Sequence, residues 1–336
     1  MQGGIHDDTE LEVLAQLGVV NIDESPAKAW TEWTTGMMVE RRDRCDKYGI
    51  SLEMMHLPLS GRVAVEGTRH ARGDDVSPAG AIWLGPSEER DRLIDQACEV
   101  IRMAGEAGLR GMNYNITVLG HMRTESDTGR GGVPVSTFEF DKLDQSFGEF
   151  EGGAADEDTM WERIEHWLQR VIPVAEEYKV QMACHPSDPG IGVGNAFRGV
   201  ARPLGMPEGF KKFIDLYDSP YNGLNFCQGC MSEALENPAE EIFDVIRYFG
   251  ERKKIFNVHF RNIKGGLNNF VEVFPDEGDI DMLQALRTYK EVGYEYMIMP
   301  DHVPHISGEA PYQVGFAYTF GYIHALMQAV EQGTGN

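Results

Sequence analysis

The sequence has no long apolar run. None of its 336 residues lies in an uncharged apolar stretch of about 18 residues, the length that suggests a membrane-spanning helix. The first residues, MQGGIHDDTELEV, lack the basic and apolar regions of a secretory signal. We therefore expect neither a membrane span nor a cleaved leader.

Basic residues are scarce. The chain holds 30 Lys and Arg against 54 Asp and Glu, which gives a formal net charge of -24. A strongly acidic protein repels nucleic acid and anionic lipid, so neither is an expected partner. An anionic substrate would need a locally positive pocket, supplied by a metal ion or by arginines.

Cysteine is also scarce. Five cysteines, an odd number in a fairly large chain, do not resemble a secreted disulfide framework. We expect a reducing, cytoplasmic location, where thiols stay available as metal ligands.

The chain contains no Gly/Ser linker and no break in composition. Short β-rich runs alternate with longer amphipathic segments such as TMWERIEHWLQRVIPVAEEY. Seven runs are expected strands, at 18–22, 50–57, 109–116, 180–185, 223–228, 255–260 and 296–301. The expected helices are 29–48, 86–107, 157–178, 207–217, 238–250, 280–293 and 312–332.

This rhythm predicts an α/β fold, a (β/α)8 TIM barrel formed by residues 1–336 as one domain. The brief GGIH at 3–6, followed by a helix at 7–17, is the candidate for the eighth strand. A doubly wound open sheet is the competing fold, but no GxGxxG follows the first clear strand.

Two connections are unusually long, at 58–85 and 117–156, and each follows an expected strand. In a barrel they would lie on the catalytic face. For 117–156 we weigh two interpretations equally, a lid over the active site and a solvated insertion.

Four consecutive expected strands each end with a side chain that can bind a metal ion. These residues are His185, Cys227, His259 and Asp301. A single histidine or cysteine at a strand end is more often structural, but four in succession converge on one rim of a barrel. Two imidazoles, a thiolate and a carboxylate suit Mn2+, Fe2+, Co2+ or Zn2+.

The remaining cysteines receive other interpretations. Cys230 forms a C-x-x-C pair with Cys227, but no second pair completes a zinc knuckle, and a redox pair normally opens a helix. We therefore treat Cys230 as incidental. Cys184 should point away from His185, and Cys45 and Cys98 belong to expected helices.

Further polar residues lie near the same strand ends. Arg261 could hold a substrate carboxylate, and His302 could act as a general acid or base. Candidates for binding sugar hydroxyls are Asn113, Asn115 and Asp188. Glu53 could bind a sugar hydroxyl or be paired in the barrel interior. Nothing in the sequence assigns a role to His305.

Several motifs in the C-terminal half resemble, in the same order, those of the mannonate dehydratase family. They are IPVAEEYKVQMACHPSDP, FCQG at 226–229, HFRN at 259–262, FVEVFPDEGDIDM at 270–282 and MPDH at 299–302. The resemblance covers about residues 170–305 and implies a xylose-isomerase-like TIM barrel. DHVPH stands here where that family has a DHGH-type sequence, so this loop is reshaped.

The resemblance also implies roles for individual residues. It implies a Mn2+-type ion on the four residues already selected, and substrate-binding or proton-transfer roles for Arg261 and His302. A tyrosine after the last strand takes part in that family, and Tyr312 is the best positional match.

The expected reaction is the dehydration of a small sugar acid such as D-mannonate to a 2-keto-3-deoxy acid, by an enzyme that we expect to be a homo-oligomer. One alternative is a metal-dependent sugar isomerase or epimerase on the same fold, with Glu53 or Glu272 as its base. The other is a non-catalytic barrel with a structural metal ion.

Overall fold

The computed structural model describes residues 6–24, 29–59, 78–144, 148–150 and 152–333. Within this part of the chain, no helix is both long and apolar enough to cross a membrane.

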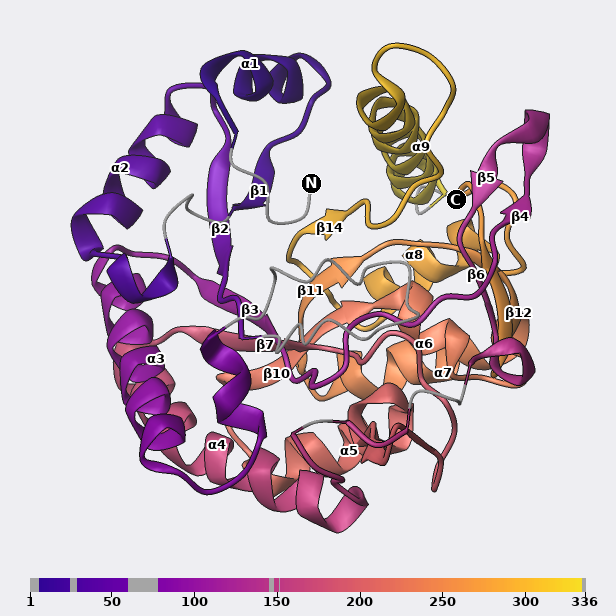
Figure 1. Ribbon diagram of the computed structural model, residues 1–336. Helices are drawn as coiled ribbons and strands as arrows, with labels where there is room; N and C mark the ends of the chain where they lie inside the picture. Colours follow the sequence, from indigo (N-terminus) through magenta and orange to yellow (C-terminus); the bar gives the residue numbers. More distant parts are fainter. Residues whose placement is uncertain (1–5, 25–28, 60–77, 145–147, 151, 334–336) are drawn as a thin grey trace.

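The centre of the molecule is a seven-stranded parallel sheet that curls into a nearly closed barrel (Figure 1). Its strands follow the order of the sequence: β1 (Asn21–Glu24), β2 (Ser51–His56), β3 (Gly111–Asn115), β7 (Gln181–His185), β10 (Asn222–Cys227), β11 (Ile255–His259) and β14 (Ile298–Met299). Every residue of β10 and β11 is buried, as expected for strands that are covered on both faces.

Helices cover the outside of this sheet (Figure 1). They are α1 (Asp8–Gln16), α2 (Thr35–Asp46), α3 (Glu88–Glu106), α4 (Glu157–Tyr178), α5 (Pro207–Leu216), α7 (Pro238–Glu251), α8 (Met282–Glu291) and α9 (Pro311–Gln332). The helix α4 begins where the Asp156 side chain accepts the Thr159 N–H at 2.9 Å. It ends at Lys179, whose φ of 58° is left-handed.

The predicted TIM barrel is confirmed, and the predicted strands and helices correspond to these elements within a few residues. The described residues contain seven barrel strands. Most of the GGIH segment lies outside them, so the eighth strand stays a prediction. His6 is described, and its backbone N–H donates to Glu24 at the end of β1 at 3.0 Å.

Part of the 117–156 connection forms structure of its own, which the sequence reasoning did not predict. β6 (Thr137–Glu139) pairs with β13 (Asn269–Glu272), which pairs in turn with β12 (Ile263–Gly266), all antiparallel. This small sheet fixes that connection beside the β11 end of the barrel. Most of the other long connection, residues 60–77, lies outside the described residues.

Candidate metal centre and active site

The four predicted ligands come together. Their donor atoms, one from each of His185, Cys227, His259 and Asp301, lie within 4.8 Å of one another, and all four residues are buried. The rings of His185 and His259 are 5.0 Å apart between centroids. Cys227 Sγ is 3.2 Å from Asp301 Oδ2.

Strand geometry explains this convergence. Cys227 pairs in register with His259 across β10 and β11, and His259 pairs with Met299 of β14, two residues before Asp301. Adjacent parallel strands deliver residues in register to the same rim, so side chains far apart in the sequence meet there.

The chemistry of these residues fits a divalent metal ion. Asp301 Oδ1 is buried and forms no hydrogen bond with any described residue, a costly state for a carboxylate oxygen unless a cation binds it. His185 Nδ1 donates to the Pro186 carbonyl at 2.7 Å, which leaves Nε2 as the ligand atom. Both observations support the predicted ligand set.

Cys227 is poised as a thiolate. Burial works to raise its pKa, but hydrogen bonds from Cys230 and His185 and the charge of Arg261 bring the pKa well below its ordinary value. Cys227 also caps the short helix α6 (Gln228–Glu233), because its sulfur accepts the Cys230 N–H at 3.4 Å. The sequence argument against a redox pair assumed that Cys227 ends a strand and opens no helix; this assumption was wrong, because Cys227 ends β10 and also caps α6.

Arg261 is surrounded by protein anions. Its Nη1 is 2.7 Å from Glu272, its Nη2 is 2.8 Å from Glu233, and its Nε is 3.1 Å from Asp301 Oδ2. Arg261 is only 2% exposed. These contacts support a role in holding Asp301 in place, whereas the binding of a substrate carboxylate by Arg261 stays a prediction.

A second buried arginine extends this ionic cluster. Arg123 Nη1 is 2.6 Å from Asp188 Oδ1, and Arg123 Nη2 is 2.9 Å from Asp188 Oδ2. Arg123 also contacts Glu272. Because both Asp188 oxygens are engaged by a guanidinium, this predicted substrate ligand is placed to orient Arg123.

His302 lies between this cluster and open space. Its Nδ1 is 3.1 Å from both carboxylate oxygens of Glu272, and a third of its side chain is exposed. Burial works to lower its pKa, but the charges of Asp301 and Glu272 outweigh burial and raise the pKa to about 10. His302 is thus arranged as a protonated acid whose Nε2, 3.8 Å from Asp301 Oδ1, can face a ligand.

The other predicted site residues lie at different depths. Asn115 ends β3 opposite His185 and is partly exposed, so its amide can reach a ligand. Asn113 is buried, and its amide binds Asp23 and His56, each at 2.7 Å. Tyr312 is partly buried in the first turn of α9, where its ring contacts His305 and Phe316.

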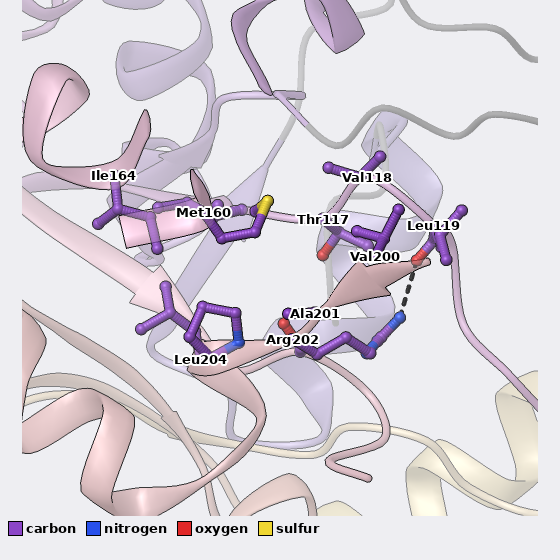
Figure 2. A pocket seen from close by; sticks show the side chains of 12 residues that line it. Thr117, Val118, Leu119, Met160, Ile164, Val200, Ala201, Arg202 and Leu204 are labelled. Atoms are coloured by element: carbon purple, nitrogen blue, oxygen red, sulfur yellow. Dashed lines mark hydrogen bonds between the residues drawn. The ribbon is translucent and has the colours of Figure 1, made fainter. Parts of the chain in front are cut away.

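A small pocket lies between the loops that follow β3 and β7 and the helix α4 (Figure 2). It is lined mainly by apolar residues and contains none of the four ligands. At its edge the buried Arg202 donates to the carbonyls of Leu119 at 3.0 Å and Gly120 at 3.3 Å. Arg202 also donates to the carbonyls of Asp188 and Pro189, at 2.8 and 3.0 Å. One guanidinium thus fastens these two loops together.

The sequence reasoning missed Arg123, Arg202 and Glu233, and it considered Glu272 only for another reaction. These residues could not be found by looking at the ends of strands. Arg123 lies in the 117–156 connection, and Glu233 lies in the unpredicted helix α6. One feature of the sequence could have pointed to Arg123: the connection 117–156 follows a strand, so it lies on the catalytic face of a barrel.

Comparison with solved structures shows which fold this barrel has. The crystal structure of mannonate dehydratase from Streptococcus suis serotype 2 superposes with a TM-score of 0.80 at 24% identity, over 99% of this chain and 94% of that chain. A xylose isomerase domain protein from Planctomyces limnophilus gives a TM-score of 0.59 at 15% identity, over 99% and 95%. The fold is therefore that of the xylose-isomerase-like TIM barrels.

Sequence comparison is more specific. The mannonate dehydratase of Thermotoga petrophila is 32% identical over 91% of this chain and 89% of its own length. That of Endomicrobium trichonymphae is 35% identical over 46% of this chain and 40% of its own. The model of the family D-mannonate dehydratase (UxuA) matches residues 131–335. The chain belongs to the mannonate dehydratase family and is an enzyme, a hydro-lyase.

Proposed function

We propose that this enzyme removes water from D-mannonate to give 2-keto-3-deoxy-D-gluconate, with a Mn2+ ion bound by His185, Cys227, His259 and Asp301. The observation that carries this proposal is the convergence of these four donors beside His302. Fe2+, Co2+ and Zn2+ are the alternative ions, because the same mixed donor set suits them.

A bound ion would act as a Lewis acid toward the carboxylate and a hydroxyl of the substrate. Residues of the chain supply proton transfer and hydroxyl binding. His302, held by Glu272 through Nδ1, presents Nε2 to the C3 hydroxyl and gives it the proton with which it leaves as water. Asn115 binds a substrate hydroxyl at the rim.

The second acid–base role, removal of the C2 proton, is assigned to Tyr312. Its place in the first turn of α9 supports this, because its phenol lies close enough to Asp301 to respond to the charge of that residue. Burial, followed by the charges of Asp301 and Asp23, raises the pKa of Tyr312, so the phenol is protonated in the free enzyme, and the positive charge of a bound ion would be needed to favour the phenolate.

The isomerase alternative is less well supported. Glu53 pairs with Arg110 at 2.7 Å, and Arg110 immediately precedes β3. Glu53 therefore lies toward the amino ends of the strands, away from the rim. Glu272 lies at the rim, but Arg123, Arg261 and His302 all engage its carboxylate.

The test is incubation of the purified enzyme with Mn2+ and D-mannonate, followed by an assay for 2-keto acid. His302→Asn should lower kcat by about 10^2 to 10^4-fold while the manganese content, measured by elemental analysis, stays unchanged. Full activity of this variant would remove His302 from the mechanism. Interconversion of aldoses and ketoses without keto acid would favour the isomerase.

We further propose that the enzyme is one barrel domain that acts as a cytoplasmic homo-oligomer. All five cysteines are free thiols, which suits a reducing compartment. Along α9 the apolar side chains of Val314, Tyr318 and Met327 are exposed, and a second copy could cover part of this helix.

A further inference from the structure

Two histidine rings face each other beside the ionic cluster. His121, in the connection after β3, is partly exposed, and its ring centroid is 6.0 Å from that of His302. Donor atoms of His121, Asp188 and His302 lie within 4.8 Å of one another. His121 thus borders the same space as the group that we assign as the proton donor.

The His121 ring has unused hydrogen-bonding capacity. Among the described residues, none forms a hydrogen bond with its two nitrogens. His302 and His185 differ in this respect, because Nδ1 of each is bonded to a protein oxygen. A histidine in a site that neither packs as core nor bonds to protein is available to a ligand.

His121 is nevertheless held in place. The two residues that precede it in the chain, Leu119 and Gly120, are fastened by Arg202 to the loop that carries Asp188. Figure 2 shows the bond from Arg202 to Leu119. This clamp joins the His121 segment to the loop that follows the ligand His185. The backbone that precedes His121 is therefore anchored, and its ring lies beside Asp188 and His302.

The three residues His121, Asp188 and His302 are poorly suited to a second metal ion. Both Asp188 oxygens are bound to the guanidinium of Arg123, whose positive charge opposes a cation there. A neutral or anionic organic ligand fits this charge distribution better. Burial lowers the pKa of His121 to about 3, so its imidazole is neutral and can both donate and accept a hydrogen bond.

We propose that His121 is a specificity-determining residue that binds a hydroxyl group of the sugar acid next to the hydroxyl that leaves. This inference rests on the proposed dehydration and adds a residue that neither the ligand set nor the family motifs identified. A neutral imidazole both accepts from and donates to a hydroxyl, and it does so without competing with the cationic groups for the substrate carboxylate.

The test compares His121→Phe with His121→Asn. The phenyl ring fills the space without hydrogen bonding, so KM for D-mannonate should rise about tenfold or more. The asparagine keeps a donor and an acceptor, so most of the affinity should return. Metal content and thermal unfolding temperature should equal those of the wild type. His166→Phe, the same change in α4 on the outside of the barrel, is the matched control.

A substrate series makes the assignment sharper. Sugar acids that each lack one hydroxyl, at C4, C5 or C6, are compared in wild type and His121→Phe. One of these acids should lack the hydroxyl that His121 binds. For that acid the KM of the wild type should rise, whereas the KM of His121→Phe should stay the same, because the variant has already lost the imidazole that binds this hydroxyl. Calorimetric binding of the same acids to His302→Asn, with and without His121→Phe, gives the affinities without turnover.

Two results would overturn the proposal: an unchanged KM in His121→Phe, or a His121→Asn variant that has lost kcat but kept KM, which would make His121 a proton-transfer group. Absence of keto acid from the wild type is a separate result. It would reject the dehydration, while the calorimetric comparison would still measure whether His121 binds a hydroxyl.

Discussion

At the scale of single residues, the centre depends on charges that neutralise one another in a buried space. Burial works to raise the pKa of Asp188, but the positive charges of Arg123 and Arg261 hold this pKa well below its ordinary value. Such a carboxylate stabilises the folded state only while it is ionised.

This gives a prediction with a definite sign. The folded-state pKa of Asp188 is lower than the value of about 3.9 for an unfolded chain. Its contribution is therefore complete above that value and is lost as the pH falls through the folded-state pKa. Between pH 5 and pH 3, urea unfolding should show that Asp188→Asn loses less stability than the wild type, by about 1 kcal/mol.

At pH 6 the same variant should be the less stable of the two, because Arg123 keeps a buried charge without its carboxylate. Parallel pH dependences for the two proteins would show that Asp188 does not titrate differently on folding.

At the scale of elements, the short helix α6 packs closely against the centre. Its second residue is Gly229, and a larger residue there would not fit. A methyl group added at Gly229 would lie 2.8 Å from Cζ of Arg261, well inside van der Waals contact. Arg261 is fixed by Glu233, Glu272 and Asp301, so it has little room to yield.

We therefore predict that Gly229→Ala lowers the free energy of unfolding by about 1–3 kcal/mol and weakens metal binding. Denaturant unfolding and metal titration measure the two effects. Gly321→Ala in the exposed part of α9 is the matched control, since nothing lies within 4 Å of the added methyl group. It should be neutral or stabilise by up to about 1 kcal/mol. Equal behaviour of the two variants would contradict this account of α6.

The elements also show why part of the site was predictable. His185, Cys227, His259 and Asp301 could be found because each ends a buried apolar strand or comes shortly after one, and parallel strands bring such positions to one rim. Arg123 and Glu233 could not, because their meeting depends on the path of a long connection and on a six-residue helix. Neither has a periodic pattern, and only the folded chain brings them to Arg261.

At the scale of the whole molecule, the metal centre should contribute to global stability. Its ligands come from four barrel strands or their ends, and an ion that binds only the folded chain stabilises it by mass action. With free Mn2+ at about 100 times its Kd, the gain is about 2.7 kcal/mol.

Removal of the metal with a chelator should therefore lower the thermal unfolding temperature, and added Mn2+ should restore it. In Asp301→Asn, which removes one ligand charge, the same treatments should have much smaller effects. A wild-type unfolding temperature that does not change on chelation, with metal loss verified by elemental analysis, would argue against a site at these residues.

The order of the ligands along the chain has a consequence for biosynthesis. A ribosome makes residues 1–184 before the first ligand, His185, exists, and it adds the fourth, Asp301, only after three more barrel strands. The ion can therefore meet its full set of donors only late in translation or after it. A cell that makes this enzyme therefore loads the ion after most of the barrel has been synthesised, and an unfinished chain that ends before Asp301 would lack one of the four donors.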